Sequence, residues 1–133
     1  MESRLAPIGL DLHLPPQLEA ASQARAAVRD TFSGRLPART VESLLTVVSE
    51  LVANSVIHGP GKTIKVTVTA DRDGSVRGEV EDDGDGKVAI REIEGEGPGG
   101  MGLRIVRALT ERWGVYEGST QVWFELRTGS PAG

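Results

Sequence analysis

Three polar side chains that could do chemistry follow one another at the spacing of a helical turn: Glu50, Asn54 and His58. A carboxylate can accept a proton, an amide oxygen suits a hard cation, and an imidazole can exchange protons near neutral pH. The apolar residues around them share an arc of a helical wheel about 140° wide: Val41, Leu44, Leu45, Val48, Leu51, Val52 and Val56. The segment 41–59 is therefore predicted to form a long helix that buries this arc, with the polar column outside it. Taken alone, such a column is also typical of a solvated helix face.

Two glycine-rich segments further along the chain, EDDGDG at 81–86 and GEGPGGMG at 95–102, allow several interpretations. The second contains the G-x-G-x-x-G pattern of dinucleotide folds, but it does not follow directly on a strand of a parallel unit. The first matches five positions of an EF-hand calcium loop, although the residues before it alternate as in a strand: Glu81, Asp83, Asp85, Gly86 and Glu92. A surface turn followed by a connecting loop is a third interpretation.

Length and composition bound the function. The chain has 133 residues, 38% of them hydrophobic and 26% charged, which suits one globular domain, expected over 8–128 with tails at 1–7 and 129–133. No apolar run approaches the roughly 18 residues of a membrane span. The lack of cysteine excludes disulfides and thiolate metal sites and fits a cytoplasmic protein. A net charge of −4 argues against sequence-independent binding of nucleic acid.

Periodicity and turn residues predict the element order β-α-α-β-β-loop-α-β-β. Thr40 is the expected N-cap of the central helix, Gly34 is expected to end the helix before it, and the segment 87–99 is interpreted as a lid or binding loop. Helices are expected at 17–32, 41–59 and 100–110, and strands at 10–14, 63–69, 75–81, 113–116 and 121–127. Because hairpins join consecutive strands, we expect an α/β two-layer sandwich, a mainly antiparallel mixed sheet covered on one face by three helices.

Three motifs in this order, Glu50-x-x-x-Asn54-x-x-x-His58-Gly59, Asp82-x-Gly84-x-Gly86 and Gly100-x-Gly102-Leu103, resemble those of the GHKL (Bergerat-fold) ATP-binding family. The resemblance covers about residues 8–128. Within the family, this chain, with its short single-domain form, is similar to the anti-sigma factor serine/threonine kinases.

The resemblance implies a role for each matching residue. Asn54 takes the Mg²⁺-ligating position, Glu50 the general-base position, and Asp82 the position that accepts the adenine amino hydrogen. Glycines near the base and the phosphates allow the backbone to approach the nucleotide closely. The other implied nucleotide-binding positions are His58, Gly84, Gly86, Gly100, Met101, Gly102, Leu103 and Thr120. For His58, a purely structural place at the helix end is an equally good interpretation.

The implied protein is a cytoplasmic regulator that uses Mg²⁺ and ATP to phosphorylate a small anti-sigma factor antagonist and that sequesters a sigma factor. The resemblance also allows a homodimer, and it implies no direct contact with nucleic acid or a membrane. The lid ends in Gly97-Pro98-Gly99, where some relatives carry a basic residue, and its only cations, Lys87 and Arg91, lie farther back. This departure keeps open a second hypothesis, a non-catalytic module of the same fold whose nucleotide controls partner binding.

Overall fold

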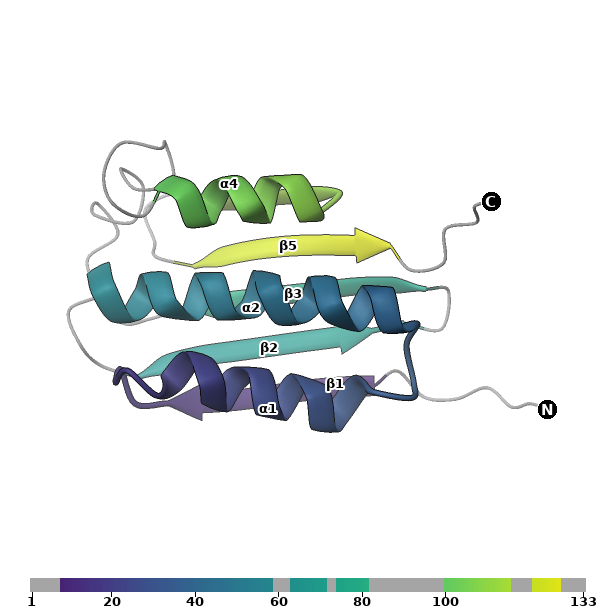
Figure 1. The fold of residues 1–133 in the computed structure, drawn as a ribbon, viewed down its shortest axis with the longest axis horizontal. Coiled ribbons are helices and arrows are strands. Elements are labelled where there is room, and N and C mark those ends of the chain that lie inside the picture. Colours follow the sequence, from purple (N-terminus) through teal and green to yellow (C-terminus); the bar gives the residue numbers. More distant parts are fainter. Residues whose placement is uncertain (1–7, 59–62, 72–73, 82–99, 116–120, 128–133) are drawn as a thin grey trace.

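A computed structural model describes residues 8–58, 63–71, 74–81, 100–115 and 121–127 of the chain. In these ranges the helices are α1 (Ala20–Phe32), α2 (Ala38–His58) and α4 (Gly100–Leu109), and the strands are β1 (Ile8–Leu14), β2 (Ile64–Ala70), β3 (Ser75–Glu81), β4 (Arg112–Val115) and β5 (Val122–Arg127). The strands form one layer and the helices another, all on the same face of the sheet (Figure 1). The expected two-layer α/β sandwich is thus confirmed, as is the order of the helices and strands within the described ranges.

The sheet has the strand order β1-β2-β3-β5-β4, and each of its four described pairings is antiparallel. Strand alternation separates an apolar face from a polar one. On β2 the residues facing the helices are Ile64, Val66, Val68 and Ala70, all buried. Their partners on β3 include Val80 and Val76, which are also buried, so one apolar row crosses the sheet beneath the helices.

The central helix α2 is buried on more sides than its apolar arc predicts. Six of the seven predicted arc residues are buried, and Val56 is half-buried. Val47 lies outside the predicted arc and is nevertheless fully buried. The reason is that α2 runs between α1 and α4 and packs against both (Figure 1).

Two of the helices begin at residues other than those expected. The predicted N-cap at Thr40 is wrong, because α2 already begins at Ala38 and the Val41 N–H donates to the Pro37 carbonyl at 3.0 Å. The Pro37 carbonyl accepts the first helical hydrogen bond, so Pro37 rather than Thr40 occupies the N-cap position. Helix α1 begins at Ala20 rather than Gln17, whose N–H instead closes a turn on the Pro15 carbonyl at 2.8 Å.

The predicted end of α1 near Gly34 is confirmed, and a second break in regular structure falls at Gly74. Gly34 has φ +80°, a left-handed conformation that glycine adopts without strain, and α1 ends two residues before it. Gly74 has φ +92°, and the chain reverses there with the Asp71 N–H donating to the Ser75 carbonyl at 2.8 Å. None of the described helices is long and apolar enough to cross a membrane.

Candidate functional site

The polar column lies on the flank of α2 that faces α4. Near the start of α2, Thr40 and Ser43 line a hollow together with Ala108 and Leu109 of α4, which identifies this flank. Val47, one turn beyond Ser43, is fully buried on the same side. Because Ser43, Val47, Glu50 and Asn54 follow the spacing i, i+4, i+7 and i+11, they form one row along the helix. Glu50 and Asn54 are therefore directed toward the seam between α2 and α4, and both are half-buried.

Helices α2 and α4 run in opposite directions along this seam. The last residues of α4 lie beside the first turns of α2, so the first turn of α4 lies near the end that carries Asn54 (Figure 1). Gly100 and Gly102 stand in that first turn, and His58 is the last residue of α2. A helix N-terminus offers free backbone N–H groups, which bind phosphate well, and glycine leaves them accessible. A carboxylate, an amide and a helix N-terminus thus meet at one end of the domain.

Strand register brings two more segments to the same end. The Lys65↔Glu81 and Val80↔Val122 pairs place the end of β3 and the start of β5 at the same end of the sheet as the start of β2, which follows α2 after a short link. Residue 82 follows β3 directly, and residue 120 stands just before β5. The predicted site residues Asp82, Gly84, Gly86 and Thr120 lie outside the described residues, as does the predicted lid at 87–99, so their roles stay predictions. The side chains of His58, Met101 and Leu103 lie outside the described part as well.

The fold argues against two alternative interpretations of the glycine-rich segments, the EF-hand loop and the dinucleotide-binding motif. An EF-hand loop follows a helix, whereas the residues before EDDGDG form strand β3. A dinucleotide fingerprint opens a parallel unit, whereas every described strand pairing is antiparallel.

The side chains at this end fit a cation held jointly with phosphate. The described residues contain no cluster of three or more His, Asp or Glu side chains that could hold a metal ion by themselves. Mg²⁺ commonly takes only one or two protein oxygens and completes its shell with phosphates and water. The Asn54 amide oxygen can supply one such ligand, and Glu50, which makes no ion pair or hydrogen bond with another described residue, keeps its carboxylate available to accept a proton.

The open face of the sheet carries a separate charge network. Arg112 donates to Glu125 from Nη2 at 2.8 Å and from Nε at 3.0 Å, and Arg77 donates to the same carboxylate at 2.8 Å. These bonds, those from Arg112 above all, hold the pKa of Glu125 below its ordinary value of 4.5, against a smaller opposing effect of burial. Arg77 also stacks on Trp123, 5.2 Å from the ring centroid. The network lies on the opposite face of the sheet from α2.

Comparisons with known proteins relate this chain to a protein family and to solved structures. Residues 14–126 match the family model described as the histidine kinase-like ATPase domain. The crystal structure of the RsbU and RsbW domains of Rv1364c from Mycobacterium tuberculosis matches with a TM-score of 0.71 and 26% identity. That match covers 93% of this chain and 33% of the other, so the present chain spans about a third of its relative. A comparison with curated protein sequences gives no match.

Proposed function

Because the chain belongs to the histidine kinase-like ATPase family, we propose that it binds ATP with Mg²⁺ at the α2–α4 end and transfers the terminal phosphoryl group to a serine or threonine of an anti-sigma factor antagonist. The observation that carries this proposal is the row of Glu50 and Asn54 on the flank of α2 that faces α4, at the end where the glycines of α4 begin. In a second state the protein would sequester a sigma factor. The likeness to a structure that contains an RsbW domain supports this partner class.

Each of the proposed site residues has a separate role in the reaction. Asn54 holds the cation through its amide oxygen, and the bound Mg²⁺ would neutralise charge on the phosphates. Glu50, one turn earlier, accepts the proton of the attacking hydroxyl. The first turn of α4 binds phosphate oxygens through backbone N–H groups near Gly100 and Gly102. Asp82 accepts a hydrogen bond from the adenine amino group, and Gly84 and Gly86 let the chain turn beside the base.

A second candidate is a nucleotide-gated binding module without phosphoryl transfer. It is favoured by the sequence at the end of the predicted lid, Gly97-Pro98-Gly99, which contains no cationic residue. A positive charge at that place would stabilise the charge that develops during transfer.

Incubation with radiolabelled ATP and a purified antagonist protein separates the two candidates. Phosphorylated antagonist that depends on added Mg²⁺ supports the kinase. If ATP binds saturably but no label reaches the antagonist protein, the chain is a nucleotide-gated binding module. A failure to bind ATP at all would refute both.

A further inference from the structure

The other end of the α2–α4 seam holds a groove that the nucleotide chemistry does not use. Helix α2 has 21 residues and α4 has 10, so at about 1.5 Å per residue α4 is roughly half as long. It ends at Leu109, beside the first turns of α2 and the end of β5. The space left there is a cavity of about 470 Å³ between the first turns of α2, the end of α4 and the end of β5. We call it the end groove.

The lining of the end groove is apolar at its base and on one wall. Leu126 of β5 lies at the edge of the core with 6% of its surface exposed, and Pro37 and Ala108 add further carbon. Leu109 is 36% exposed, one of two large apolar side chains exposed in the described part of the chain. A volume of this size lies within the range that holds a side chain or a small ligand.

The rim of the end groove is polar and carries excess positive charge. Arg39 is exposed and makes no ion pair with any described residue. Arg127 pairs with Glu111 at 3.5 Å, so these two charges largely offset each other. The hydroxyls of Thr40 and Ser43 also line the groove, and neither makes a hydrogen bond within the described residues. One positive charge and two available hydroxyls thus stand beside an apolar base.

We propose that the end groove docks a segment of a partner protein in which a large apolar side chain stands next to a carboxylate. The apolar side chain would cover Leu109 and Leu126, and the carboxylate would pair with Arg39. Apolar anchors in pockets flanked by a charged contact are the usual form of an interaction hot spot. A free anion would leave the apolar base uncovered, and one unpaired arginine is too little for nucleic acid. The proposal goes beyond the proposed function, because the groove lies at the opposite end of α2 from Glu50 and Asn54.

The test uses the full chain and amide shifts in ¹⁵N-labelled protein. The probe is a capped leucyl-glutamate dipeptide, and the matched control is the capped leucyl-lysine dipeptide. We expect saturable shifts centred on Thr40, Ser43 and Thr110, with an apparent Kd about fivefold lower for the glutamate probe, as for one partly exposed ion pair. Equal affinity for both dipeptides, or no shifts at these amides at millimolar probe, would overturn the proposal.

Two further readouts identify other occupants. If acetate alone shifts the same amides to the same extent, the groove is a small-anion site and the proposal is wrong. If these amides shift with protein concentration in the absence of probe, a second copy of the chain occupies the groove, which also overturns the proposal.

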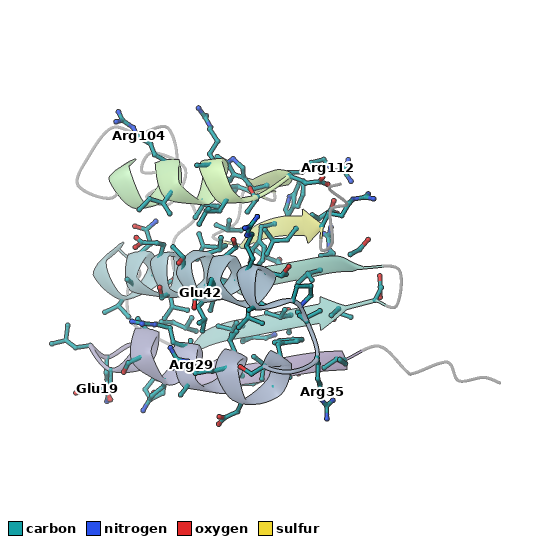
Figure 2. All side chains as sticks on the ribbon, turned by 45° about the vertical axis from the view of Figure 1, so that its right-hand side comes forward. Glu19, Arg29, Arg35, Glu42, Arg104 and Arg112 are labelled. Carbon is teal, nitrogen blue, oxygen red and sulfur yellow. The ribbon has the colours of Figure 1, made fainter. Side chains whose placement is uncertain are left out.

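Variants connect the shifts to the groove. Arg39→Glu should weaken the glutamate probe at least fivefold. Arg35→Glu is the matched control, because Arg35 is also an exposed, unpaired arginine among the described residues but does not line the end groove and points away from α4 at the α1–α2 connection (Figure 2). Ala108→Phe, which places a ring in the open volume, should abolish binding even if Arg39→Glu fails to fold. Retained binding in Ala108→Phe would refute the proposal.

Discussion

Among the glycines of the described strands, Gly78 leaves the least room for a side chain, so Gly78→Ala tests the packing beneath α2. Gly78 on β3 pairs with Phe124 on β5, and the Phe124 ring lies over it. A methyl group added there would stand 2.7 Å from Cε2 and 2.9 Å from Cε1 of Phe124 and would overlap Cζ. Phe124 is fully buried, so its ring has to displace core neighbours to make room.

The expected cost of Gly78→Ala follows from this overlap. Forcing one extra carbon into a packed core lowers the free energy of unfolding by about 1–3 kcal/mol. For a chain of 133 residues, an unfolding entropy of about 2.1 cal/mol/K per residue converts this to a fall of roughly 4–11 °C in Tm. Differential scanning calorimetry measures the shift directly.

Two controls make this prediction specific to the ring. Gly9→Ala is the matched variant, because its added carbon would lie 3.8 Å from the Val68 carbonyl oxygen, an ordinary contact, and its stability should stay within about 0.5 kcal/mol of the parent. Phe124→Leu removes the end of the ring, so the double variant should be more stable than the sum of the single effects by about 0.5–3 kcal/mol. Strict additivity, or a Gly78→Ala protein as stable as the parent, would refute the packing argument.

Two further predictions concern charge and the nucleotide base. Because Arg112 and Arg77 lower the folded-state pKa of Glu125, their stabilisation is fully present above pH 4.5 and is lost as the pH falls through the folded pKa. In urea unfolding, Arg112→Gln should therefore have a lower free energy of unfolding than the parent at neutral pH, and this difference should shrink in acid. A difference that stays constant with pH would contradict this prediction. Asp82→Asn should weaken ATP binding roughly 10- to 150-fold in calorimetry by removing a charged acceptor worth about 1.5–3 kcal/mol, whereas unchanged affinity in a folded variant would exclude Asp82 from the site.

The strands and the polar column could be predicted from sequence because both depend on local spacing. Alternation in the segment 75–81 predicts β3 with its observed ends, and the turn spacing of Glu50 and Asn54 places them in one row whatever surrounds the helix. The hairpin-linked strand order likewise predicts an antiparallel sheet with the helices on one face.

What could not be predicted depends on contacts between distant segments. To predict the burial of Val47, one has to know which flank of α2 packs against α4. The only sign of this flank in the sequence is that Val47 shares one row of the helix with Ser43, Glu50 and Asn54. The end groove arises where α4 ends beside the first turns of α2 and the end of β5, and no residue pattern encodes this meeting of distant segments. Residue type favours Thr40 as the N-cap, but the helix begins at Ala38 and the Pro37 carbonyl accepts its first hydrogen bond.

The central claim is that Glu50 serves chemistry and Asn54 serves nucleotide binding, and one set of variants tests it. Glu50→Ala, Asn54→Ala and the control Glu42→Ala, which removes an exposed carboxylate from the same helix (Figure 2), are compared for Tm, Mg²⁺-dependent ATP affinity and rate of phosphoryl transfer. Glu50→Ala should keep ATP affinity and lose about 10²–10⁴ in rate, Asn54→Ala should lose affinity that depends on Mg²⁺, and Glu42→Ala should match the parent. A Glu50→Ala protein that transfers phosphate at the parent rate would contradict the kinase mechanism, and loss of fold in both site variants would show that the polar column is structural.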